Sequence, residues 1–257
     1  LTDNKGTLEE TKVKLNDSYA NLINDARETE VRVQGLSSSY NLYKSMEEGY
    51  EGYYKSVKNI LQAINNKRLD KKGYEGVIAD LLKVEAKYEK AIEISLGSSL
   101  QNIVVENEIS AKTMINYLKK NKMGRVTFLP RNVIKGNPIK LDINKLKEFG
   151  FIGLAHTLID YDEKYKNIFE SLLGRTLVVD NIDNAIKLAN RFTHTYRIVT
   201  LDGDLLNPGG SLTGGSYNSD AISIISRKNR ILEIEEEIKK STVNKDRLQN
   251  KINNLSK

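Results

Sequence analysis

The chain has 257 residues, 39% of them hydrophobic and 29% charged, and a net charge of +6 at pH 7. No stretch approaches about 18 consecutive apolar residues, which excludes a transmembrane helix. The absence of cysteine excludes disulfides, thiolate zinc sites and cysteine nucleophiles, and two histidines leave little material for metal or triad chemistry. The sequence starts with Leu rather than Met and shows no signal peptide, so we expect a piece of a longer protein.

Residues 1–69 carry an apolar repeat of seven residues with a companion set four residues later. The two sets are Leu8, Leu15, Leu22, Thr29, Leu36, Tyr43, Tyr50, Val57 and Ile64, and Lys12, Tyr19, Ala26, Val33, Tyr40, Glu47, Tyr54 and Leu61. The positions between them are mostly polar, so one apolar seam runs along a helix, as in a coiled coil. We therefore expect an N-terminal coiled-coil arm over 1–69, in which Gly35 could break or bend the helix.

From 70 to 222 the pattern changes to short apolar runs between helical segments. All three prolines and most glycines lie here. The β-rich runs are 102–105, 125–129, 176–179 and 196–201, and the helical patterns are 84–96, 108–121, 162–173 and 182–193. This alternation predicts a mixed α/β (α+β) globule.

The expected globule also repeats itself in the same order. The matches are Tyr88, Glu93, Leu96 and Gly97 with Tyr165, Glu170, Leu173 and Gly174, then Val104, Val105 and Ala111 with Val178, Val179 and Ala185, then Arg125 and Val126 with Arg197 and Ile198. We infer two related subdomains, about 74–135 and 150–218, joined by a basic linker at 136–149. The alternative is that two α/β units share these short matches by accident.

Residues 223–257 restore the heptad pattern. Its seam is Ile231, Ile234, Ile238, Ser241, Lys245, Leu248, Ile252 and Leu255. A single amphipathic helix cannot bury its seam alone in water, so the two terminal helices are expected to pack antiparallel on each other. Because the arms differ in length, residues before about Val31 have no obvious partner in this chain.

A glycine-rich segment at 207–216 closes the globule, and three interpretations of it differ in chemistry. Exposed backbone N–H groups can hold a phosphate, but no Lys follows Gly214 and Gly215 as a P-loop requires. Tight turns with positive φ are the plain alternative. The third interpretation, a dimer interface, depends on a family resemblance.

No catalytic or metal constellation is visible in the sequence. His156 and His194 lie among mostly apolar and aromatic residues and are expected to be structural. Asp202 and Asp204 flank a glycine, but the remaining ligands of a calcium loop are missing, so we interpret them as turn residues. Because nothing assembles a nucleophile, a base and an orienting group, we expect no enzymatic activity from this chain.

The layout and several motifs resemble the hinge of an SMC (structural maintenance of chromosomes) protein of the bacterial or archaeal chromosomal type. The motifs are Gly-Arg-Val-Thr-Phe-Leu-Pro at 124–130, Leu-Gly-Arg-Thr at 173–176, Tyr-Arg-Ile-Val-Thr-Leu-Asp-Gly at 196–203 and the glycine-rich segment. The approach to the globule at 71–78 is less glycine-rich than is usual in that family.

The resemblance implies a module that forms a homodimer, with glycines letting two backbones approach and the glycine-rich edge meeting the first subdomain of the partner. The implied interface residues are Gly209, Gly210, Ser211, Thr213, Gly214 and Gly215. It also implies a longer protein acting in chromosome condensation and segregation, as condensin does. Its ATP-binding heads, with ATP and Mg²⁺, lie outside this chain, as do kleisin-type subunits at the heads. No membrane is expected, and the implied location is cytoplasmic and nucleoid-associated.

Basic residues gather near the expected junction of arm and globule and in a basic run over 119–147 within the globule. The candidates for weak, non-specific DNA binding are Lys67, Arg68, Lys71, Lys72, Lys119, Lys120, Lys122, Arg227, Lys228 and Arg230. Such patches neutralise phosphates and release counterions, and a solvated surface of a Lys-rich protein is the alternative interpretation. We therefore weigh two functions, a dimerisation module and a nucleic-acid-binding module whose self-association is incidental.

Overall fold

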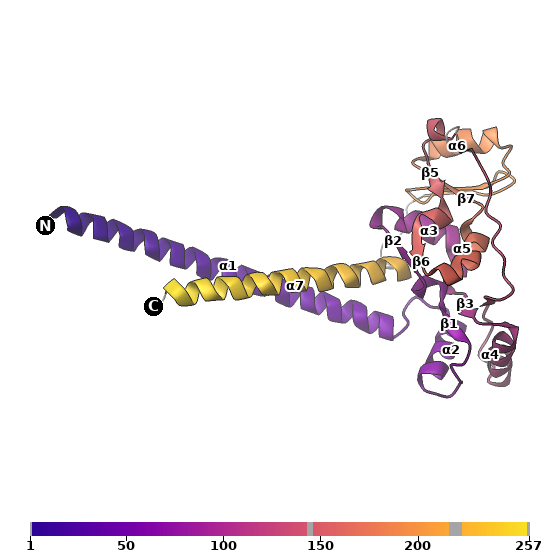
Figure 1. The fold of residues 1–257 in the computed structure, drawn as a ribbon, viewed down its shortest axis with the longest axis horizontal. Coiled ribbons are helices and arrows are strands. Elements are labelled where there is room, and N and C mark those ends of the chain that lie inside the picture. Colours follow the sequence, from indigo (N-terminus) through magenta and orange to yellow (C-terminus); the bar gives the residue numbers. More distant parts are fainter. Residues whose placement is uncertain (1, 143–145, 216–222, 256–257) are drawn as a thin grey trace. The chain divides into compact units, whose positions relative to one another are not determined.

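The computed structural model describes residues 2–142, 146–215 and 223–255, with side chains from Glu9 onward. The chain divides into two compact units (Figure 1). The arm unit comprises Leu1–Glu51 and Arg227–Lys257, and the globular unit comprises Gly52–Ser226. In the described part of the chain, no helix combines the length and apolar character needed to cross a membrane.

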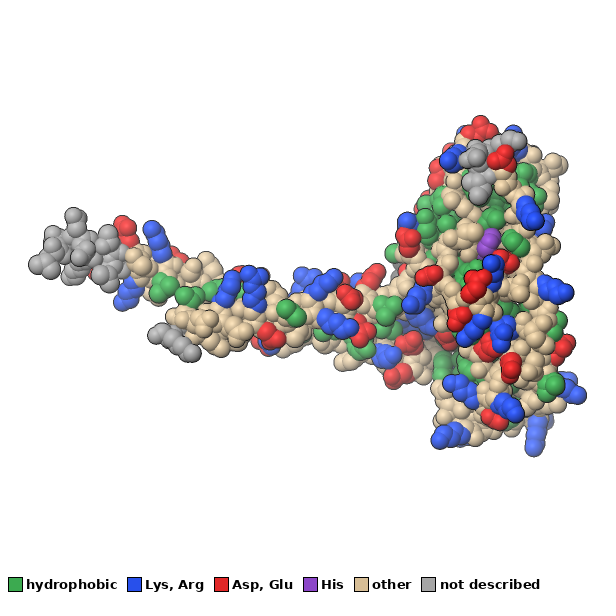
Figure 2. All heavy atoms as spheres, viewed as in Figure 1, with side chains coloured by type: hydrophobic (Ala, Val, Ile, Leu, Met, Phe, Trp, Pro, Cys, Tyr) green, Lys and Arg blue, Asp and Glu red, His purple; other side chains and the backbone are tan. Residues whose placement is uncertain are grey.

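The arm unit consists of α1 (Thr2–Glu48) and most of α7 (Ile224–Leu255), which lie side by side and antiparallel (Figure 1). Two ion pairs join the helices, Lys245 Nζ to Glu30 Oε1 at 2.8 Å and Arg32 Nη2 to Glu237 Oε2 at 3.4 Å. Lys, Arg, Asp and Glu side chains are mixed along both helices (Figure 2). The expected antiparallel coiled coil is therefore confirmed.

Burial in the arm unit follows the predicted seam. On α7, Ile231, Ile234 and Leu248 are buried, whereas Leu232 and Val243 between seam positions are 53% and 69% exposed. The half-buried seam positions of α1 are Tyr19, Leu22, Ala26, Thr29, Val33, Leu36, Tyr40, Tyr43 and Glu47. The seam side chains of α1 are therefore partly buried from Tyr19 onward, whereas we expected residues before about Val31 to have no partner. Helix α1 continues through Gly35 without a break.

The prediction that one coiled-coil seam continues to Ile64 is wrong. Helix α1 ends at Glu48, and Tyr50 and Gly52 adopt φ values of 53° and 81° in the turn that follows. Val57, Leu61 and Ile64 lie on the separate helix α2 (Lys55–Asn65) and are buried in the globular unit. Heptad spacing marks an apolar stripe on any helix, so it did not distinguish this packed helix from a continuing arm. The globular unit accordingly begins at Gly52, not at the expected residue 70.

The globular unit contains two sheets, a two-stranded ribbon and five α-helices among its described residues. The first sheet has the order β1 (Tyr74–Val77), β3 (Ile103–Val105), β4 (Phe128–Pro130). The second has the order β10 (Leu212–Thr213), β9 (Leu205–Leu206), β8 (Arg197–Thr200), β7 (Thr176–Val179), β5 (Phe151–Leu154), and the ribbon pairs β2 (Leu82–Val84) with β6 (Ile159–Tyr161). Besides α2, the helices are α3 (Glu89–Leu96), α4 (Glu108–Lys120), α5 (Lys166–Leu173) and α6 (Ile182–Arg191).

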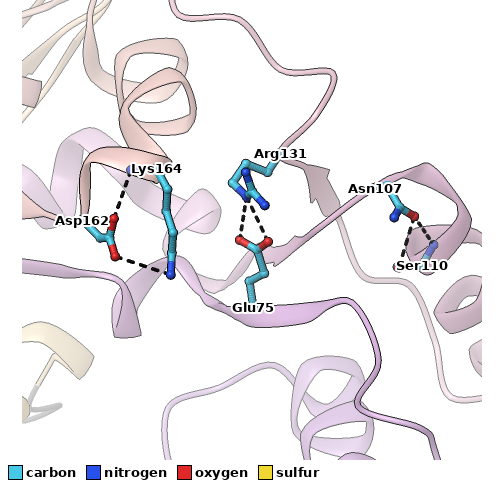
Figure 3. Close-up of polar contacts among 6 residues, drawn as sticks. All are labelled: Glu75, Asn107, Ser110, Arg131, Asp162 and Lys164. Atoms are coloured by element: carbon cyan, nitrogen blue, oxygen red, sulfur yellow. Dashed lines mark hydrogen bonds and ion pairs between the residues drawn. The ribbon is translucent and has the colours of Figure 1, made fainter.

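The two halves of the globular unit repeat the same fold, which confirms the predicted pseudo-repeat. In each half an antiparallel pair with a register shift (β1 with β3, β5 with β7) is followed by a parallel pair (β3 with β4, β7 with β8). The helices α4 and α6 both start at an asparagine cap. Asn107 Oδ1 accepts the N–H of Ser110 (Figure 3), and Asn181 Oδ1 accepts that of Asn184, each at 3.0 Å.

The ribbon lies where the two repeats meet. Lys83 of β2 pairs with Asp160 of β6, and these residues occupy equivalent positions in the two repeats. The ribbon is therefore symmetric about its central pair. Sequence patterns predicted β3, β7 and β8 but neither ribbon strand. The predicted strand at 125–129 is shorter in the structure, where β4 begins at Phe128 and the carbonyl of Thr127 accepts the N–H of Ile103.

The core is shared between the repeats. One buried cluster joins Ile92 of α3 and Val104 of β3 with Phe169 of α5 and Val178 of β7. A second cluster includes Leu177, from the opposite face of β7. Both faces of β7 are covered, as is usual for a strand in a parallel pair, which explains why its sequence is apolar throughout rather than alternating.

Candidate functional site

The glycine-rich segment forms a short hairpin at the outer edge of the second sheet. The N–H of Asn207 donates to the carbonyl of Ser211 at 2.9 Å, and the N–H of Gly210 donates to the carbonyl of Asn207 at 3.0 Å. This turn joins β9 to β10, which has a strand neighbour on one side only among the described residues. An exposed edge strand presents backbone donors and acceptors to a further strand.

The side chains of this edge, which we define as residues 209–215 and call the glycine-rich edge, face solvent. Ser211, Thr213, Gly214 and Gly215 are exposed, Gly210 is half-buried and Leu212 is an apolar side chain 56% exposed. Leu212 is the residue that sequence reasoning missed, since only the strand pairing shows that an apolar side chain stands on an open edge.

Two glycines of the edge differ in what an added side chain would meet. A Cβ on Gly214 would lie against Oδ1 of Asp204, so a side chain there requires that carboxylate to move. A Cβ on Gly209 would meet only open space, but this residue has a φ of 87°, which L-residues rarely adopt. A tight turn is therefore enough to explain a glycine at position 209. It does not explain why the nearby apolar side chain of Leu212 is exposed.

Seven of the ten DNA-binding candidates lie in the globular unit, in the segment that follows α2 and at the end of α4. We call Lys67, Arg68, Lys71, Lys72, Lys119, Lys120 and Lys122 the basic surface, and all seven are exposed. None of them forms an ion pair with a residue that the structure describes. The helices α2 and α4 contact each other, and Gly124, just beyond α4, lies against Ser56 at the start of α2. Blue side chains are prominent over this part of the globular unit (Figure 2).

The remaining three DNA-binding candidates lie on α7 in the arm unit, and the structure contradicts one of them. Arg227 is 1% exposed, and its Nη1 donates to the backbone carbonyl of Glu51 at 2.9 Å. A buried guanidinium cannot contact a phosphate, so Arg227 is a structural residue. Arg230 is exposed but pairs with Glu233 at 3.0 Å, and Lys228 is half-buried.

Another cation of the basic run before the linker is also structural. Nε of Arg131 lies 2.9 Å and 3.0 Å from the two carboxylate oxygens of Glu75 (Figure 3). This pair ties the segment after β4 to β1 within the first subdomain. The sequence showed a cation in a basic run, and only the fold shows the carboxylate opposite it.

The residues considered for catalysis have structural surroundings. Asp204 accepts from the Thr200 hydroxyl at 3.1 Å within the turn after β8. His156 is partly buried, and burial lowers its pKa below the ordinary value, although Glu170 opposes the shift. In the described ranges, no group of three His, Cys, Asp or Glu side chains is placed to hold a metal ion.

The family profile described as SMC proteins Flexible Hinge Domain matches residues 71–189. The Chromosome partition protein Smc of Clostridium kluyveri is 38% identical over 250 residues, which are 96% of this chain and 20% of that protein. The Bacillus subtilis protein of the same name is 37% identical over 204 residues, 79% of this chain and 17% of that protein. The chain thus spans about a fifth of the length of these curated relatives.

Solved structures agree with this assignment over nearly the whole chain. The structure described as an asymmetric dimer of the Geobacillus stearothermophilus SMC hinge domain is 30% identical with a TM-score of 0.81, covering 95% of this chain and 97% of that one. The Pyrococcus furiosus SMC hinge domain is 30% identical with a TM-score of 0.52, covering 73% of this chain and 93% of that one. With two folded repeats, paired terminal helices and these similarities, the chain belongs to the SMC hinge family.

Proposed function

We propose that this chain is a homodimerisation module that joins two coiled-coil arms through the glycine-rich edge. The observation that carries the proposal is the edge of β10 with which no described strand pairs, where Leu212 is 56% exposed. The first sheet also ends in an edge strand, β4. Two copies related by a two-fold axis can place the glycine-rich edge of each against the first subdomain of the other, which makes two equivalent contacts per dimer. The dimer described for the Geobacillus stearothermophilus hinge domain supports self-association of hinge domains, although that dimer is described as asymmetric.

Two contacts per dimer would make the association both tight and able to open. When one contact breaks, the other keeps the surfaces at high effective concentration, so the broken contact re-forms quickly. In a longer chain with ATP- and Mg²⁺-binding heads and kleisin-type subunits at the far end of the arms, such a module would help close a ring or rod around DNA. The role is mechanical, in chromosome condensation and segregation at the nucleoid, and involves no turnover in this chain.

The test is the oligomeric state of a variant that changes only the exposed edge. Sedimentation velocity at micromolar concentration should show a dimer for the wild type and a monomer for Leu212→Asp, because the new charge would be buried in the interface. The matched control is Ile186→Asp, at a 40% exposed position of α6 in the same subdomain, which should remain dimeric. A monomeric wild type, or a dimeric Leu212→Asp, would refute the proposal.

We propose DNA binding by the basic surface as a second function. Its support is that seven exposed cations follow α2 and α4, two helices in contact, without ion-pair partners among the described residues. Backbone contacts of this kind carry no sequence preference and weaken steeply with salt.

Charge reversal tests the second function. The triple variant Lys119→Glu, Lys120→Glu, Lys122→Glu should lower the affinity for a DNA duplex and reduce the salt slope by about one unit for each phosphate that the variant no longer binds. Lys239→Glu with Lys240→Glu, which changes exposed lysines of α7, serves as the control. An unchanged slope in retardation assays at several salt concentrations would contradict DNA binding by this surface.

A further inference from the structure

The turn that follows α6 holds two consecutive residues in a left-handed conformation. Thr193 and His194 have φ values of 51° and 52°. Left-handed φ is a genuine outlier for a β-branched residue such as Thr, and such conformations persist only where the surroundings enforce them. Here the N–H of His194 donates to the carbonyl of Ala189 at 2.8 Å and that of Thr193 to the carbonyl of Asn190 at 3.1 Å.

Aromatic packing fixes both ends of this turn. Phe192 and Tyr196 make an edge-to-face contact with ring centroids 5.1 Å apart, and both pack against the buried cluster of the second subdomain. The first repeat ends α4 differently, with a single left-handed residue, Lys122, before Gly124. The first sheet also has no counterpart of β9 and β10 among its described strands. The repeats therefore diverge at this turn and at the glycine-rich edge together.

His194 connects these two divergent features. Its carbonyl accepts the N–H of Gly209 at 2.9 Å, and its ring lies beside Gly210, whose added Cβ would be 3.8 Å from Cγ and Nδ1. A Cβ on Gly209 itself would have no neighbour within 4 Å. Among the described residues, the His194 ring is therefore the side chain that packs beside this turn at Gly210.

We propose that His194 is a positioning residue for self-association: its carbonyl and ring hold the 207–210 turn in the shape that a second copy of the chain recognises. The inference rests on the proposed dimerisation through the glycine-rich edge. The strained backbone at 193–194 is maintained because it lets the carbonyl and the ring of His194 both contact the 207–210 turn.

His194→Asn tests the role of the ring, because Asn tolerates the left-handed region and keeps the carbonyl. Its dimer dissociation constant should rise about tenfold, the scale of one interface-supporting side chain. Thr193→Asn, at the neighbouring left-handed residue with an exposed side chain, is the control and should leave the constant unchanged.

Hydrogen exchange separates positioning from general destabilisation. In the monomeric Leu212→Asp background, His194→Asn should speed exchange at Gly209 while amides in β7 keep the protection of the background. A wild-type dimer whose affinity is unaffected by His194→Asn, or weakened equally by Thr193→Asn, would overturn the inference and leave the proposed function intact. A monomeric wild type would instead overturn the proposed function.

Discussion

At the scale of single residues, Arg227 shows how a charge can mislead. It stands in a run of cations at the start of α7, which predicts a solvated patch, yet its side chain is buried. Nη1 bonds the carbonyl of Glu51, whereas Nε and Nη2 have no hydrogen-bond partner in the described structure. Burying a cation is costly unless it is well bonded, so its position depends on packing that one charge in the sequence does not reveal.

Arg227→Ala should lower the free energy of unfolding by roughly 1–3 kcal/mol, because it removes a buried side chain and leaves the Glu51 carbonyl without its donor. Arg230→Ala, at an exposed ion pair of the same helix, should change it by less than about 0.5 kcal/mol. Urea denaturation of both variants compares them. Equal effects would contradict the structural role assigned to Arg227.

His156 predicts a pH dependence of stability. Burial lowers its pKa in the folded chain, so the unfolded chain takes up a proton first as the pH falls. The contribution of the neutral ring is therefore present above the unfolded pKa of about 6.5 and is lost as the pH falls below it. His156→Gln should flatten the dependence of unfolding free energy on pH between about 8 and about 5.5. Parallel curves for variant and wild type would contradict this assignment.

At the scale of elements, patterns identified those with a strong period or an uninterrupted apolar run. The helix α7 was predicted because one full stripe of its surface is mostly apolar and covered. The strands β3, β7 and β8 were predicted because both of their faces are covered, so their sequences are mostly apolar. The ribbon strand β2 and the edge strand β10 were missed because each has two or three residues, too few to show alternation. Their existence depends on a partner strand that sequence patterns do not reveal.

The candidate site was likewise predictable where it depends on a local motif and not where it depends on contacts between distant residues. The glycine-rich segment was located from its residues, because left-handed turns need glycine and the motif is local. Leu212 and His194 were not assigned to the edge, because the place of Leu212 follows from strand pairing and the contact of His194 with the turn follows from the fold. Arg227 was assigned wrongly because burial is a property of the fold.

The matching helix caps of the two repeats make a prediction at this scale. Asn107→Ala and Asn181→Ala should each lower the free energy of unfolding by about 1 kcal/mol, because each removes the acceptor for an N–H in the first turn of its helix. Asn116→Ala, at an exposed position inside α4, should not destabilise the protein. Thermal unfolding measures all three, and a cap variant as stable as the wild type would show that its cap is dispensable.

At the scale of the whole molecule, the net charge of +6 acts on the two proposed functions with opposite sign. Two copies of a cationic chain repel each other, and salt screens that repulsion. DNA binding depends on counterion release and is weakened by salt. Raising NaCl from about 50 mM to about 200 mM should therefore leave self-association unchanged or slightly stronger while DNA affinity falls at least tenfold. Sedimentation and retardation in the same buffers would test this, and a parallel loss of both would show that the dimer contact is itself electrostatic.

The ribbon of β2 and β6 has a consequence for how the polypeptide reaches its native state. Each repeat contributes three residues to a pair that neither can complete alone, and the shared cluster of Ile92 and Phe169 lies with it. A polypeptide nicked between the repeats would yield two fragments, each exposing an orphan strand and half of an apolar surface. Such fragments should gain order only on mixing, so the two repeats behave as one cooperative folding element although each has the same topology.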